Sequence, residues 1–262
     1  MSMVSGVFGG VDTHADVHVA AAVDTNGGML GIGSFPTNEA GYRSLKDWLR
    51  GFGPVIRVGV EGTGSYGVGL ARHLHREGIE VVEVDRPDRQ KRRKLGKSDP
   101  IDAEAAARAA LSGSAKTTPK RRDGTVEQMR VLMIARRSAR MQRNQTLNQL
   151  RQIVICAPDE IRARFKDRPK AGLVTEAARM RPRKGSDSVT YTTYAVIRSL
   201  ARRIKDLNDE MRTIDDALRG LIGQTAPSLL DCYGVGAATA ATLLVTAGDN
   251  PDRLHTERSW AH

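Results

Sequence analysis

Short apolar runs follow one another closely at the start of the chain. The runs Val7–Asp12, Val17–Val23 and Met29–Phe35 are each long enough for a β-strand. Thr25-Asn26-Gly27-Gly28 supplies hairpin-turn residues between the second and the third run. The pattern therefore predicts an antiparallel meander of three strands.

Two helices and two further strands are predicted after the meander. Thr37 or Asn38 can cap the first helix, whose apolar face is Tyr42, Leu45, Trp48 and Leu49. The predicted ranges are 38–50 for this helix, 55–60 for a strand, 66–77 for a helix and 79–84 for a strand. Because helical crossovers join the later strands, the order predicts a mixed five-stranded sheet covered by helices. A further helix is expected from about Pro100 to Leu111.

The apolar positions beyond Thr125 follow a helical period instead. A first stripe consists of Met129, Leu132, Ala139, Leu147, Leu150 and Val154, with Arg136 and Arg143 on the same line. A second stripe, which we call the heptad seam, is Ile197, Leu200, Ile204, Leu207, Met211, Ile214, Leu218 and Leu221. Its alternating steps of three and four predict a coiled coil. An ordinary amphipathic helix in a bundle is the alternative, and the seam does not distinguish a hairpin within the chain from a dimer.

Loop-forming residues mark a boundary between these two regions. Ser112-Gly113-Ser114 and Thr117-Thr118-Pro119 interrupt the pattern. The stretch from Arg162 to Lys184 is basic and interrupted by proline, and no element is predicted in it. We therefore expect three domains: residues 1–115 as an α/β domain, 116–223 as a basic helical or coiled-coil region, and 224–262 as the start of a further helical domain.

The charge balance favours a polyanionic partner. The chain has 41 Lys and Arg against 30 Asp and Glu, a formal net charge of +11, and an isoelectric point near 10.0. Such charge favours nucleic acid, although a basic protein of another kind is the alternative. Cys156 and Cys232 have no zinc-binding or disulfide-framework spacing, and no stretch is apolar enough to span a membrane. We therefore expect an intracellular, cytoplasmic protein.

Two segments are candidates for contacting phosphates. One is a basic stretch with almost no apolar content, whose charged residues are Arg86, Arg89, Lys91, Arg92, Arg93, Lys94 and Lys97. A solvated loop is the alternative interpretation. The other is Gly234-Val235-Gly236 between two short helical segments, which is similar to a helix-hairpin-helix turn. A tight turn with close packing explains Gly234 and Gly236 equally well.

Four carboxylates occupy positions that this fold could bring together. Asp12 ends the first predicted strand and Glu61 follows the fourth, so both emerge at the same sheet end if these strands are parallel neighbours. Asp99 and Asp102 share one face at the start of a helix. Hard oxygen ligands of this kind suit Mg²⁺, which can activate an attacking oxygen and stabilise a leaving oxygen at a phosphodiester. Each residue alone could instead cap a turn or a helix. His14 is interpreted as a neighbour of Asp12 rather than as a ligand.

Three motifs together resemble a known family. They are Gly10-Val11-Asp12-Thr13-His14, Val60-Glu61-Gly62-Thr63-Gly64-Ser65-Tyr66-Gly67 and Lys97-Ser98-Asp99-Pro100-Ile101-Asp102-Ala103. They resemble the DEDD transposases of bacterial insertion sequences, whose N-terminal domain is like that of Holliday-junction resolvases. The helical middle and the segment from Tyr233 to Asp249 also match the layout of that family.

The resemblance implies both a fold and a function. It implies an RNase H-like α/β domain in which Asp12, Glu61, Asp99 and Asp102 are catalytic and bind Mg²⁺. It also implies recombination of element DNA with target DNA, guided by a bridge RNA, in the bacterial cytoplasm at the nucleoid. We expect a homo-oligomer that forms through the helical region.

One departure from the family concerns its nucleophilic serine. That serine lies downstream of the Gly-x-Gly hairpin, and Ser259 does not match its motif. We therefore expect a C-terminally truncated transposase that binds metal and nucleic acid but is inactive alone. A metal-dependent junction nuclease and a noncatalytic nucleic-acid-binding remnant are the alternatives. A sugar kinase or actin-like ATPase would need a nucleotide-binding second domain, which residues 125–222 do not resemble.

Overall fold

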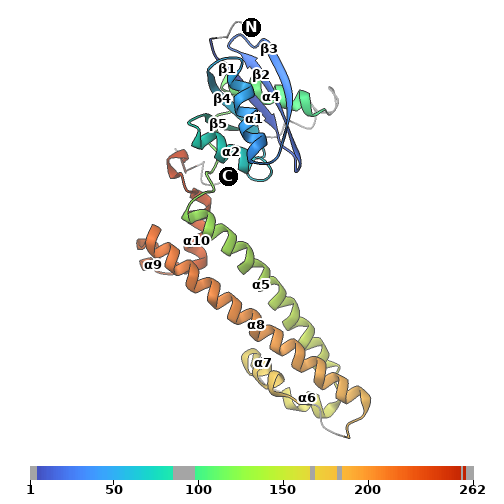
Figure 1. Cartoon of the computed structure of the whole chain (residues 1–262). Coiled ribbons are helices and arrows are strands. Elements are labelled where there is room, and N and C mark those ends of the chain that lie inside the picture. The colour runs from blue at the N-terminus through green and yellow to red at the C-terminus, as the bar shows by residue number, and fades with distance from the viewer. Residues whose placement is uncertain (1–4, 85–97, 166–168, 182–184, 255, 258–262) are drawn as a thin grey trace. The chain divides into compact units, whose positions relative to one another are not determined.

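The chain forms two compact units. The computed structural model describes residues 5–84, 98–165, 169–181, 185–254 and 256–257. The sheet unit combines residues up to Gly124 with those from Thr246 onward, and the helical unit runs from Thr125 to Val245 (Figure 1).

A five-stranded mixed sheet forms the centre of the sheet unit. Its strands are β1 (Val7–Asp12), β2 (Val17–Asp24), β3 (Met29–Pro36), β4 (Val55–Glu61) and β5 (Glu80–Val84), in the order β3-β2-β1-β4-β5. β1, β2 and β3 pair antiparallel, whereas β4 pairs parallel with both β1 and β5. The predicted meander and the predicted mixed sheet are therefore confirmed.

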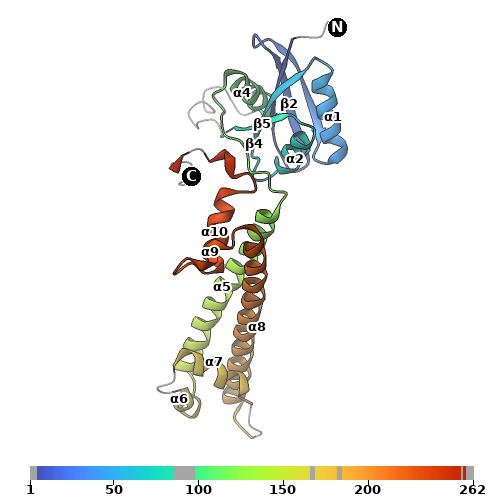
Figure 2. The ribbon, with the colours of Figure 1, turned by 90° about the vertical axis from the view of Figure 1, so that its left-hand side faces the viewer.

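Helices cover both faces of this sheet. α1 (Glu39–Arg50) and α2 (Val68–Arg76) pack on one face, and α4 (Asp99–Ser112) packs on the other. Figure 2 shows α1 and α4 on opposite sides of the strands. The predicted cap of α1 is Asn38, whose Oδ1 accepts a hydrogen bond of 3.0 Å from the amide of Gly41.

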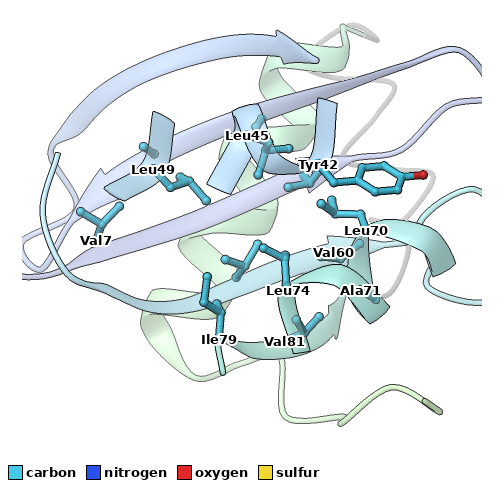
Figure 3. Close-up of a cluster of buried hydrophobic side chains, with 14 residues drawn as sticks. Val7, Tyr42, Leu45, Leu49, Val60, Leu70, Ala71, Leu74, Ile79 and Val81 are labelled. Carbon is cyan, nitrogen blue, oxygen red and sulfur yellow. The ribbon is translucent and has the colours of Figure 1, made fainter. Parts of the chain in front are cut away.

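The core of the sheet unit lies between the strands and the pair α1 and α2 (Figure 3). Leu45 and Leu49 of α1 and Leu70 and Leu74 of α2 are fully buried there. These residues recur at helical spacing, so one apolar stripe of each helix faces the sheet.

Two long helices make up most of the helical unit. α5 (Thr125–Ile155) and α8 (Ser188–Thr225) lie side by side. They run antiparallel, since Met129 near the start of α5 clusters with Leu218 near the end of α8, while Leu150 clusters with Ile197. Most of the heptad seam is buried inside this chain, against α5.

Shorter helices complete the helical unit. α6 (Asp159–Phe165) and α7 (Lys170–Arg179) occupy much of the stretch between Arg162 and Lys184, in which the sequence predicted no element. Their apolar residues join the cluster formed by α5 and α8. The turn between α9 (Ser228–Asp231) and α10 (Ala237–Ala247) contains Gly234, whose φ of +80° favours glycine. None of the helices in the described ranges is long and apolar enough to cross a membrane.

Candidate active site

The close approach of α4 to the sheet sets the geometry of the site. Gly10 of β1 and Gly59 of β4 are opposite each other in the parallel register and face the backbone of α4. A Cβ atom at Gly10 would overlap the amide nitrogen of Ala107 and the carbonyl oxygen of Ala103. The buried face of α4 consists largely of alanines, so glycine and alanine together allow helix and strands to lie unusually near each other.

This packing places the first turn of α4 at the carboxyl ends of β1 and β4. Side chains alternate between the faces of a strand, so Asp12 lies on the same face as Gly10, and Glu61 lies on the same face as Gly59. Asp99 and Asp102 lie in the first turn of α4, before the alanines that contact Gly10. Four carboxylates from three elements are thereby directed to one end of the sheet.

Asp12 is a buried carboxylate whose surroundings perturb its pKa. It is 5% exposed, and burial raises the pKa of Asp12 above its ordinary value. The negative charges of Asp102 and Asp99 raise this pKa as well, whereas a hydrogen bond and the charge of His14 lower it. A cation bound among these groups would relieve both the repulsion and the cost of burial.

Glu61 is the last residue of β4 and precedes a sharp turn. It is 7% exposed, and its carbonyl oxygen accepts a hydrogen bond of 2.8 Å from the Thr13 hydroxyl, which connects the ends of β4 and β1. The next residue, Gly62, has a φ of +69° that a residue with a side chain rarely adopts. The turn therefore fixes the end of β4 beside that of β1.

One group of candidate metal-ligand atoms in the described chain includes a histidine. His14 Nε2 lies 3.1 Å from Asp12 Oδ2 and 3.5 Å from Asp99 Oδ1, and one ligand atom from each of the three residues falls within 4.8 Å of the others. Among the described residues, Glu61 and Asp102 do not join this group. The residues fit a divalent ion, since carboxylate oxygens and an imidazole nitrogen are both metal ligands.

Little in the amino-acid sequence indicated that His14 would lie between two carboxylates. His14 was interpreted as a neighbour of Asp12, and its contact with Asp12 agrees with that. Its approach to Asp99 depends on how α4 packs, which no local pattern indicates. The alternation of Asp12, His14, Asp16 and His18 was the only feature of the sequence that could have indicated a role for His14 at the site.

Only two of the predicted nucleic-acid-binding residues lie within the described ranges. Arg86, Arg89, Lys91, Arg92, Arg93, Lys94 and Lys97 lie outside the described residues. Gly234 and Gly236 are described and exposed, in the turn before α10.

A groove in the helical unit adds a basic surface that the sequence did not single out. α5, α7 and α8 line it, and its charged lining residues are Arg143, Arg151, Lys205 and Arg212. No carboxylate belongs to the described lining of this basic groove. Arg143 donates a hydrogen bond to Asn208 at 2.8 Å, and Arg212 donates one to Asp209 at 2.6 Å. Two of the four cationic side chains of the groove are therefore already hydrogen-bonded to neighbouring side chains.

A mixed five-stranded sheet in the order β3-β2-β1-β4-β5, covered by helices and followed by further helices, is consistent with an RNase H-like α/β domain. The chain matches the model of the DEDD transposases of IS110 type, described as transposase, over residues 9–155. The protein belongs to this family of DNA transposases. No curated protein matches the chain.

Proposed function

We propose that this transposase binds DNA together with a guide RNA and uses Mg²⁺ at Asp12, Glu61, Asp99 and Asp102 to cleave and transfer DNA strands. The observation that carries the proposal is the meeting of Asp12 with the first turn of α4, where His14 Nε2 lies within 3.5 Å of both Asp12 and Asp99 oxygens. In this proposal residues 1–115 form the catalytic domain, 116–223 the basic helical region and 224–262 a C-terminal helical region.

The positions of the four acidic residues determine which of them would hold the ion and which would supply further oxygen ligands. Asp12 and Asp99 are close enough to hold one ion, and Glu61 and Asp102 supply further oxygens from the adjacent strand and the same helix turn. A bound divalent ion would activate the attacking oxygen and stabilise the leaving oxygen of a phosphodiester. The raised pKa of Asp12 indicates that its carboxylate gains from any cation placed there.

Nucleic acid would contact the chain through its cations. The helical unit carries half of the Lys and Arg residues but fewer than half of the Asp and Glu residues, so most of the net charge of +11 falls on it. The basic groove offers a concave surface for a phosphate backbone, and the exposed turn at Gly234 and Gly236 offers backbone amides. The segment from Arg86 to Lys97 is proposed as a third contact.

Self-association through the helical unit is also part of the proposal. The heptad seam packs against α5 within the chain, so a different surface must support an oligomer. Val131, Ile134 and Met141 lie at helical spacing on α5 and are more than half exposed. Replacing Ile134 with Lys should lower the molecular mass in light scattering without lowering stability. An unchanged molecular mass for Ile134→Lys would show that this surface does not support self-association.

Affinity cleavage tests whether metal and DNA meet at the acidic site. Fe²⁺ substituted for Mg²⁺ is oxidised by added hydrogen peroxide to Fe³⁺, which releases hydroxide and a hydroxyl radical, and ascorbate reduces the Fe³⁺ back to Fe²⁺. The radicals cut nearby strands without a protein nucleophile. The full chain would be tested on a four-way DNA junction and on linear duplex. We expect localised cuts that Asp12→Asn abolishes and Asp16→Asn preserves, since Asp16 is exposed on the hairpin after β1.

Three outcomes are distinguishable in this experiment. Cuts that persist in Asp12→Asn would contradict a metal site at Asp12. Binding without any localised cut would support a noncatalytic role. Hydrolysis of the junction with Mg²⁺, leaving no protein attached to either DNA end, would favour a junction nuclease over a transposase that forms a covalent intermediate.

A further inference from the structure

We propose that His14 is a nitrogen ligand of the divalent ion held by Asp12 and Asp99, and that this mixed centre prefers transition ions such as Mn²⁺ and Co²⁺ to Mg²⁺. The inference rests on the proposed function, because it assumes a metal at the acidic site, and it adds a ligand outside the four carboxylates.

The spacing of the three side chains fits one coordination shell. In an octahedral shell with ligands at about 2.1 Å, adjacent ligand atoms lie about 3.0 Å apart and opposite ones about 4.2 Å apart. His14 Nε2 is 3.1 Å from Asp12 Oδ2 and 3.5 Å from Asp99 Oδ1, and the group as a whole falls within 4.8 Å. The three atoms can therefore occupy neighbouring positions around one ion after small adjustments.

The backbone of His14 is fixed by the sheet unit. The Thr37 hydroxyl donates to the carbonyl oxygen of His14 at 3.0 Å, and the amide of His14 donates to Nδ1 of His18 at 3.4 Å. His18 is fully buried and stacks on Tyr42 of α1, with ring centroids 5.7 Å apart. Two hydrogen bonds thus hold the backbone of His14, one of them to the fully buried His18, while the side chain of His14 is itself partly exposed.

The chemistry of the donor set determines the preferred metal. Mg²⁺ is bound mainly by oxygen and keeps several waters, whereas an imidazole nitrogen adds affinity for transition ions. Affinity for such a site rises from Mn²⁺ to Co²⁺ in the divalent series. The contribution of His14 should therefore be small for Mg²⁺, larger for Mn²⁺ and largest for Co²⁺.

Without a metal, the same contacts could be a hydrogen-bonded imidazole between two carboxylates. That interpretation requires no nitrogen–metal bond, so the bond itself must be observed. Mn²⁺ is a suitable probe, because its electron spin couples measurably to the ¹⁴N nucleus of a bound imidazole.

The experiment is pulsed electron paramagnetic resonance of Mn²⁺ bound to the full chain, with competition titrations against Mg²⁺. We expect ¹⁴N modulation in the native protein, its loss in His14→Gln, and its retention in His75→Gln, a control at an exposed histidine of α2. The Mn²⁺-over-Mg²⁺ affinity ratio should fall at least about tenfold in His14→Gln, since even an outer-shell partner contributes that much at many metal sites.

The results separate this inference from the proposed function. Mn²⁺ that binds in an Asp12-dependent manner but shows no ¹⁴N modulation would overturn the role of His14 and leave the acidic site standing. If the folded native chain binds no Mn²⁺, the proposed metal site itself fails. The spectrum of the native protein decides the question even if a variant misfolds.

Discussion

Gly10 of β1 lies directly against the backbone of Ala107 in α4, with no room for a side chain between them. The contact joins the strand that ends in Asp12 to the helix that begins with Asp99. The relative position of these two carboxylates therefore depends on a residue that carries no chemistry of its own.

Replacing Gly10 with Ala should separate α4 from the sheet. We expect a loss of about 1–3 kcal/mol in the free energy of unfolding, because the new methyl group overpacks a rigid contact. Metal affinity should fall as well, since Asp99 moves away from Asp12. Chemical denaturation and Mn²⁺ titration would measure the two effects.

Gly220→Ala is the matched control for this change. Apart from its chain neighbours and the nearby backbone of its own helix, no atom of the described residues lies within 4 Å of a Cβ at Gly220. The position lies inside α8, towards its C-terminal end, so alanine should stabilise the chain by about 0.5–1 kcal/mol. Equal changes in the free energy of unfolding and in Mn²⁺ affinity for the two variants would contradict the steric argument.

Leu207→Lys should destabilise the helical unit. Leu207 is 8% exposed in the heptad seam, and loss of a buried leucine alone costs at least about 2 kcal/mol. Val189→Lys places the same side chain at a position 65% exposed and should change stability by less than about 0.5 kcal/mol. Denaturation curves of both variants would test this, and similar midpoints would mean that the seam is not buried in solution.

The ion pair between Arg136 and Asp215 should couple α5 to α8. Its two hydrogen bonds measure 2.6 and 3.2 Å, and the bond to Asp215 raises the pKa of the Arg136 guanidinium above its ordinary value. A double-mutant cycle with Arg136→Gln and Asp215→Asn should give a coupling energy of about 1 kcal/mol. The exposed pair Arg212 and Asp209 should give a coupling energy near zero. A larger coupling energy for that pair than for Arg136 and Asp215 would refute the pairing of the two helices through Arg136.

Binding of nucleic acid should weaken steeply with salt. Each phosphate contact that is lost should reduce the slope of log affinity against log salt by about 0.9 on duplex DNA. We expect Arg151→Gln and Lys205→Gln to reduce the slope, because both residues line the basic groove. Arg219→Gln should not, since Arg219 pairs with Asp216 at 2.7 Å outside the described lining. A flat dependence for the native chain would exclude an interface dominated by phosphates.

Local periodicity explains what could be predicted from the sequence. The strands of the meander, the Asn38 cap and the two long helices have strong signals within a few residues of each position. The heptad seam predicted a buried stripe but not the helix that covers it. The hydrogen bonds from Arg136 and Arg143 to α8 identify that helix as α5. α6 and α7 were missed because prolines interrupt a short, highly charged pattern. The carboxylates were predicted from the strand and helix ends at which they lie, whereas the place of His14 depends on tertiary packing alone.

The sheet unit is assembled from two separate stretches of chain. Asn250 returns from beyond the helical unit to accept from the amide of Arg121 at 3.2 Å and to donate to the carbonyl oxygen of Pro119 at 3.0 Å. The helical unit is thus an insertion, covalently continuous at both ends with one discontinuous domain. A single proteolytic cut within residues 125–245 would yield two fragments, and both would contribute to the same folded domain. Nicked protein could therefore remain a noncovalent complex, separable only under conditions that also release Asn250 from its partners.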